Sequence, residues 1–101
     1  MSGSTLYLKT ANVTIANTNT AQKVFPSISP KVTYISFKIS TGTAYVGDSL
    51  VNAAGVPPVG TLVGTTEKEF YAQARHGIAT DQLYVSGTAA AVLAVTYLEA
   101  K

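Results

Sequence analysis

The stretch from residue 31 to residue 40 has the clearest alternation of apolar and other side chains in the chain. Ile35, Phe37 and Ile39 fall on every second position, and Tyr34, Ser36 and Lys38 lie between them. Successive side chains of a strand point to opposite faces of its sheet, so this pattern is typical of a half-buried strand. We therefore expect a strand over Lys31–Ser40 with one face in the core.

A short break and a second strand follow. Thr41-Gly42-Thr43 interrupts the alternation, and Ala44-Tyr45-Val46 resumes it. A polar break with a glycine between two β-rich runs indicates a hairpin, so the two strands are expected to pair. Residues 50–60 contain Pro57 and Pro58 among glycines, which predicts a long loop.

The same alternation recurs along the rest of the chain. Residues 17–20 are polar and indicate a turn, and Pro26 and Pro30 make the segment between them an edge or a connection. Further short strands are expected at residues 6–9 and 13–15, 61–66, 83–86 and 91–98.

Residues 67–76 are ambiguous. They have fair helix propensity, yet Phe70, Ala72 and Ala74 alternate with polar neighbours. A strand is favoured because the surroundings are β, and a helix over Glu67–Arg75 stays open.

About seven or eight short strands at a spacing of about ten residues are typical of a sandwich or barrel. The expected fold class is all-β, a single-domain β-sandwich or jelly-roll-like barrel of antiparallel strands with little or no helix. One domain is expected over residues 1–101, with residues 1–16 as an N-terminal arm or strand used in assembly.

Charge is scarce: 12% of the residues are charged and 47% are hydrophobic. A membrane protein or a protein that hides surface in an assembly would explain this. No apolar run approaches the roughly 20 residues of a membrane helix, so the assembly remains. The net charge is +2, and the basic residues are scattered, which argues against nucleic-acid binding. Cys is absent, and the first residues lack signal-peptide features.

Reactive groups form no recognised site. His76 is the only histidine and is expected in a solvated turn. One His without Cys cannot supply the three or four ligands of a zinc site. The few carboxylates include Asp48 and Asp81, which suit turns. We therefore expect no enzyme activity, no metal and no cofactor.

The tyrosines in the expected strands either border the core or contribute to an interface, where Tyr is enriched. Tyr34 is the best interface candidate, because it lies opposite the face of Ile35 and Phe37.

The second half of the chain resembles a family of small structural proteins of tailed phages. The resemblance rests on Ala44–Val51 (AYVGDSLV), Gly55–Gly60 (GVPPVG) and Leu83–Ala89 (LYVSGTA), and it covers about Val32 to Leu98. Two prolines and a valine stand at 57–59 where the family has one proline and a leucine, and residues 67–76 are longer and more charged than in the family. The resemblance implies a sandwich or jelly-roll-like module of the virion, at the capsid surface and often trimeric.

The first hypothesis is a capsid decoration (cement) protein, made in the host cytoplasm, that binds the major capsid protein as a homo-oligomer, with a trimer favoured. The N-terminal arm is expected to contact the shell or a neighbouring protomer. The candidate interface residues are Leu6, Leu8, Val13, Ile15 and Tyr34. The alternative is a tail- or fibre-associated module that binds a host glycan or another virion protein, with exposed tyrosines and Asp48 serving a sugar.

Overall fold

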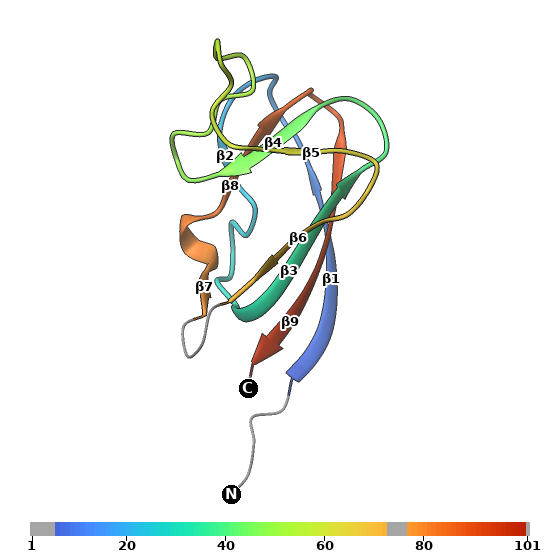
Figure 1. Ribbon diagram of the computed structural model, residues 1–101, viewed down its shortest axis with the longest axis vertical. Helices are drawn as coiled ribbons and strands as arrows, with labels where there is room; N and C mark the ends of the chain where they lie inside the picture. The colour runs from blue at the N-terminus through green and yellow to red at the C-terminus, as the bar shows by residue number, and fades with distance from the viewer. Residues whose placement is uncertain (1–5, 73–76, 101) are drawn as a thin grey trace, which may run out of the picture.

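The computed structural model describes residues 6–72 and 77–100, and these form two antiparallel sheets that face each other (Figure 1). The five-stranded sheet has the order β1 (Leu6–Thr14), β9 (Val92–Ala100), β3 (Lys31–Ile39) and β6 (Lys68–Tyr71), and β7 (Ile78–Ala79) also pairs with β3. The four-stranded sheet has the order β2 (Gln22–Lys23), β8 (Tyr84–Gly87), β4 (Ala44–Gly47) and β5 (Thr61–Val63). Within these ranges the only helical turn is the 3-10 turn η1 (Thr80–Gln82). The all-β sandwich expected from the sequence is confirmed, with two additional strands of two residues each, β2 and β7.

The strand order describes a long antiparallel ribbon that is rolled up. β1 pairs with β9, β2 with β8, β3 with β6, and β4 with β5, so the first four strands pair with later strands in reverse order. Consecutive strands β1 to β4 alternate between the two sheets. Rolling such a ribbon produces the two-sheet jelly roll, which the sequence offered as one form of the fold.

The alternating residues of β3 supply the centre of the core. Ile35, Phe37 and Ile39 are buried against the four-stranded sheet, as their spacing predicts. Two edge-on ring pairs extend this packing: Phe37 with Phe70 at 5.9 Å between ring centroids, and Phe25 with Tyr97 at 5.3 Å. Such pairs add a small stabilisation beyond the burial of their area.

The predicted hairpin of residues 31–46 is wrong, because β3 and β4 lie in different sheets. The segment Thr41-Gly42-Thr43 crosses from one sheet to the other. Gly42 adopts φ +81°, and the Thr43 amide donates to Thr88 Oγ1 at 3.0 Å. The Thr88 amide in turn donates to the Thr43 carbonyl at 2.9 Å. These bonds attach residues 41–43 to the end of β8, so the strand that follows, β4, pairs with β8 rather than with β3.

Two other expectations are settled by the fold. Lys68–Tyr71 is strand β6, so the strand reading of this segment is confirmed there, while His76 lies outside the described residues. The long loop between β4 and β5 is present, and an isolated bridge between Asn52 and Val59 narrows it. Asp48 accepts the Leu50 amide at 2.9 Å, so it serves the turn at the start of this loop.

Of the N-terminal arm expected over residues 1–16, residues 1–5 lie outside the described residues, and Leu6–Thr14 is strand β1 of the sandwich. β1 pairs with β9 at every position from Leu6 to Thr14, and the Ile15 amide continues the pairing by donating to the Ala91 carbonyl at 2.9 Å. Ile15 is fully buried. A deletion that reaches into β1 would therefore remove part of the fold as well as any contact made by its surface.

The crossing segment gives a direct test of this topology. At Gly87 a β-carbon would clash with the Thr43 carbonyl oxygen and approach Ala44 Cα to 2.9 Å. We expect Gly87→Ala to lower the free energy of unfolding by roughly 2–3 kcal/mol, because backbone must move to make room. The matched control is Gly64→Ala, where nothing lies within 4 Å of the added carbon. That variant should be neutral or slightly stabilising in urea unfolding. Equal effects of the two substitutions would contradict the described approach of β8 to the crossing.

Candidate interaction surfaces

An apolar row runs across the outer face of the five-stranded sheet. The register places Leu8 beside Leu98, Leu98 beside Tyr34, and Tyr34 beside Tyr71. Leu8 is 68% exposed and Tyr71 is 65% exposed, whereas Leu98 and Tyr34 between them are half-buried. Four strands thus contribute one side chain each to a row whose two ends face solvent. We call these four residues the outer row.

Polar groups fix the aromatic end of the outer row. The Tyr34 hydroxyl donates to Glu69 Oε2 at 2.9 Å, and its ring lies 5.0 Å from that of Tyr71 at an interplanar angle of 52°. At the next position on the same face of β3, the buried Ser36 hydroxyl donates to Glu67 Oε2 at 3.0 Å. The two carboxylates therefore hold the side chains of Tyr34 and Ser36 from the side of β6, and Tyr34 in turn offers its ring to Tyr71.

The pKa of Tyr34 is raised from its ordinary value. The hydrogen bond with the Ser36 hydroxyl lowers this pKa, but the hydrogen bond to Glu69, partial burial and the nearby negative charges outweigh it. The neutral phenol is the form that donates to a carboxylate. The bond therefore supports the fold at neutral pH and is lost as the pH rises through the raised pKa.

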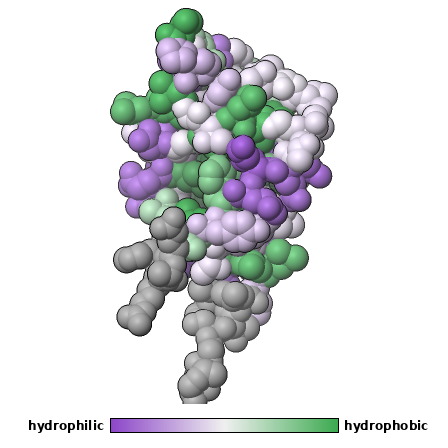
Figure 2. Space-filling model, in the orientation of Figure 1, coloured by the Kyte–Doolittle hydropathy of each residue, from purple (hydrophilic) through white to green (hydrophobic). Residues whose placement is uncertain are grey.

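A second apolar surface lies at the β4–β5 end of the molecule. Four aliphatic side chains of this loop and of β5 are exposed: Leu50 (75%), Val56 (99%), Val59 (49%) and Leu62 (53%). In Figure 1 the loop projects beyond the sheets at the top of the view, and Figure 2 shows hydrophobic side chains gathered at that end. Aliphatic side chains on a projecting loop are costly to leave in water, and groups of them commonly mark contact sites. We call these four residues the loop surface.

The predicted interface residues do not share one face. Leu8 and Tyr34 lie in the outer row, and Leu6 pairs with Ala100 at the start of β1. Val13 instead packs against the core, and Ile15 is fully buried within it. The physical reason is parity: Leu8 and Val13 are five residues apart, an odd number, so their side chains lie on opposite faces of β1. Val13 and Ile15 therefore stabilise the chain's own fold.

Sequence reasoning considered Tyr71 only as one of several strand tyrosines that could form a contact surface, and it missed Leu98 and the whole loop surface. Tyr71 and Leu98 become neighbours of Tyr34 only through the register of three strands, which no local pattern reports. The loop surface did have a signal, since Leu50, Val56 and Val59 are aliphatic residues within a turn-rich segment.

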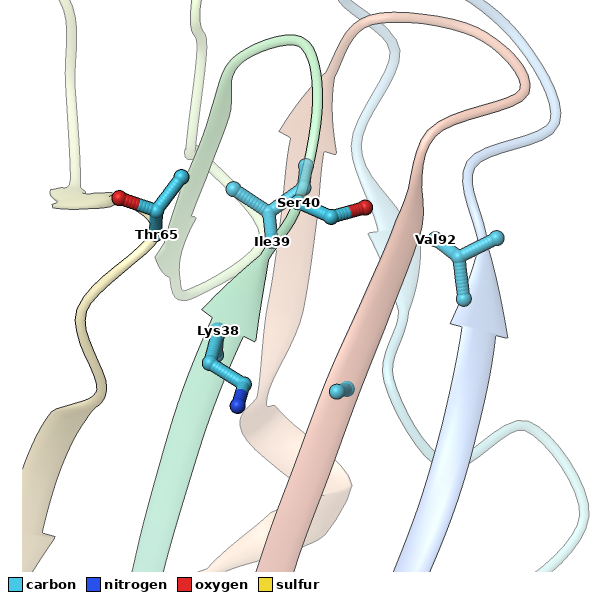
Figure 3. Close-up of a pocket in the computed structure, with 6 residues that line it drawn as sticks. Lys38, Ile39, Ser40, Thr65 and Val92 are labelled. Atoms are coloured by element: carbon cyan, nitrogen blue, oxygen red, sulfur yellow. The ribbon is translucent and has the colours of Figure 1, made fainter.

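The hollows of the surface carry little chemistry. One of about 380 Å³ opens on the outer face beside β3 and β9, lined by Lys38, Ile39, Ser40, Thr65, Val92 and Ala94 (Figure 3). Its single charged group is the Lys38 ammonium, and its lining offers no base to activate a hydroxyl. Among residues 6–72 and 77–100, no three His, Cys, Asp or Glu side chains come together as metal ligands. The same residues include no helix long and apolar enough to cross a membrane.

Comparison with known proteins identifies no relative: no family model, no curated protein and no solved structure matches this chain.

The tyrosine–carboxylate contact can be tested by titration. In Glu69→Gln the acceptor charge is gone, so the pKa of Tyr34 should fall, and the variant should ionise at lower pH in an ultraviolet or NMR titration of the ring. Glu99→Gln is the matched control, because Glu99 pairs with Lys9 Nζ at 3.6 Å on another part of the sheet. A Tyr34 titration that is the same in both variants would show that Glu69 does not set this pKa.

Proposed function

We propose that this chain is a capsid decoration (cement) protein of a tailed phage, which binds the outer surface of the head and bridges subunits of the shell. The observation that carries the proposal is the loop surface, a group of exposed aliphatic side chains at one end of a rigid, charge-poor sandwich. The partner is the major capsid protein, and the protein is made in the host cytoplasm and carried on the virion.

The physical case is that the described residues offer contact area, and no reactive site is found among them. Each exposed aliphatic side chain contributes about 1.5–3 kcal/mol when it is fully buried against a partner. Many identical sites on a shell let modest single contacts act together, because a protein that bridges two subunits binds the second at high effective concentration. A narrow loop closed by the Asn52–Val59 bridge loses little conformational freedom on binding.

The architecture supports this reading as an analogy. Jelly rolls of two facing sheets occur in viral capsid proteins and in lectins, so the rolled ribbon suits both a virion component and a sugar-binding module. Fold alone does not assign function. The resemblance of residues 44–51, 55–60 and 83–89 to small phage structural proteins favours the virion component.

The tyrosine pair favours one alternative, a tail- or fibre-associated module that binds a host glycan. Tyr34 and Tyr71 present adjoining rings next to the Glu69 carboxylate, and rings beside hydrogen-bonding groups suit a sugar. Asp48 does not join this group, because it belongs to the turn after β4 in the other sheet. A glycan array separates the two functions: a decoration protein should give no hits, and a hit that is lost in Tyr71→Ala would favour the module.

The copy number of the chain in purified particles tests the proposed function. Quantitative mass spectrometry should find it in a simple ratio to the major shell protein, either equal or a fraction such as one-third, because a cement protein occupies symmetry-related sites. A few copies per particle would place it at the tail, and absence from particles would overturn a virion role.

The loop surface should carry the contact with the shell. Val56→Asp should weaken binding to heads that lack the protein at least tenfold, because burial would strand a carboxylate without a partner. Folding should not change, since Val56 is 99% exposed. Val92→Asp is the matched control, a half-exposed valine on the outer face of the five-stranded sheet. Equal binding of both variants in a co-sedimentation assay would exclude the loop as the contact.

A further inference from the structure

β1 is a long strand at an open edge. It ends the order of the five-stranded sheet and runs for nine residues, whereas β6 at the other edge has four. The edge strands of the other sheet, β2 and β5, have two and three residues. Among the described residues no strand pairs with the outer side of β1. An edge of this length is a template for another strand unless something protects it.

The hydrogen bonds at the C-terminal end of β1 show which main-chain groups of the strand point to β9 and which point to the open edge. Ile15 directs both its amide and its carbonyl to β9, bonding Ala91 and Ala90 at 2.9 and 2.8 Å. The main-chain groups of the neighbouring residues Thr14 and Ala16 point away from β9. The Gln22 side chain bonds to two of them: it accepts from the Ala16 amide at 2.8 Å and donates to the Thr14 carbonyl at 3.1 Å. Because the β1–β9 register is unbroken, main-chain groups alternate between the two sides. The amides and carbonyls of Leu8, Thr10 and Asn12 therefore face the open edge.

The usual protections are missing from this edge. β1 (LYLKTANVT) has no proline and no bulge against β9, and its one charged residue is Lys9. Lys9 is engaged with Glu99 on β9. Among the described residues, Gln22 is the one side chain that covers main-chain groups on this side, and it does so at Thr14 and Ala16, beyond Leu8, Thr10 and Asn12. The edge is thus closed at one end and open along the rest.

We propose that a second copy of this chain pairs with the open edge of β1, antiparallel and about a twofold axis at Thr10. The pairing joins two five-stranded sheets into one sheet that runs β6-β3-β9-β1-β1-β9-β3-β6. Thr10 faces Thr10 of the second copy, and Leu8 faces Asn12 on both sides of the axis. All the open main-chain groups of Leu8, Thr10 and Asn12 then bond to their counterparts.

The chemistry of the strand selects this register over its neighbours. An axis at Lys9 would place two ammonium groups directly opposite each other, which is destabilising. An axis at Ala11 would bring Leu8 opposite Thr14, whose carbonyl already accepts from Gln22. The Thr10 axis avoids the lysine pair and moves Thr14 to the end of the pairing, opposite Leu6, so that Leu8, Thr10 and Asn12 all face open main-chain groups. It also places a Thr–Thr pair at the centre and partly covers Leu8, which is 68% exposed.

The surroundings leave space for the incoming strand. A hollow of about 350 Å³ lies beside the upper half of β1, between residues 11–14 and the segment 22–28. In the proposed register the first residues of the second β1 enter beside this hollow, because Leu8 of one copy faces Asn12 of the other. The segment 22–28 therefore flanks the site across this hollow.

This inference does not depend on the proposed function, and it differs from the trimer that the phage resemblance implies. A twofold axis makes the two surfaces of the interface identical, so the association closes at two copies. A dimer on a capsid would present two loop surfaces, but the same dimer is expected of the isolated protein.

The first test is the mass in solution, by sedimentation equilibrium. The protein should have twice the mass of its 10.5 kDa chain. Thr10→Pro should halve that mass, because proline removes an amide of the open edge and none that bonds to β9. Thr10→Val keeps the amide and should remain dimeric. A monomer, a trimer, or a dimer unaffected by Thr10→Pro with the fold intact by NMR would overturn the proposal.

The second test reads the register and does not require Thr10→Pro to fold. Because the chain has no cysteine, single cysteines can be introduced cleanly. Under mild oxidation Thr10→Cys should form a covalent dimer, whereas Leu8→Cys alone and Asn12→Cys alone should not. A mixture of Leu8→Cys and Asn12→Cys chains should cross-link to each other. Cross-linking of Leu8→Cys with itself, or of none of these variants, would exclude the Thr10 axis.

Discussion

The burial of one face of β3 is the constraint on which the rest of the structure depends. β3 lies inside the five-stranded sheet and pairs with β9 on one side and with β6 and β7 on the other. Its core face, Ile35, Phe37 and Ile39, must be covered, and a 101-residue chain has only the four-stranded sheet with which to cover it. The chain therefore has to leave its first sheet directly after β3. That need explains why residues 41–43 cross between sheets and why Gly87 has no side chain where they pass.

The sequence was sufficient for the parts of the fold that a local period determines. Alternation identified β3, β9 and the all-β class, and proline and glycine identified the long loop. The sequence did not show which strands pair. The break at Gly42 has a composition that suits both a hairpin turn and a connection between two sheets, and only the contacts of Thr43 with Thr88 distinguish the two. β2 and β7 are too short to show a period, and they exist because neighbouring strands offer them hydrogen bonds.

The candidate surfaces show the same division. Alternation alone placed Tyr34 on the face of β3 opposite Ile35 and Phe37, but it did not show which face of β1 carries Leu8 into solvent. The position of Tyr34 beside Tyr71 and Leu98 depends on which strands are neighbours. Ile15 is buried because Val13 and Ile15 lie an odd number of residues after Leu8 and therefore point to the opposite face of the strand. What results is a sandwich with three surface features: the outer row, the loop surface at one end, and the open edge of β1, which shares Leu8 with the outer row. The described residues between them present scaffold and no reactive centre.

The two edges of the five-stranded sheet differ chemically, and this bears on solubility. The edge opposite β1 is β6, which begins with Lys68 and Glu69 and is preceded by Glu67. Two negative charges and one positive charge therefore lie in a row at this edge. Another strand laid against β6 would have to approach these charges, whereas β1 presents one engaged lysine. A sheet with only one receptive edge cannot propagate, because the first addition uses up the site that a third copy would need. The scarce charge gathered at β6 and the residue before it thus disfavours the addition of a strand at the edge of the five-stranded sheet opposite β1.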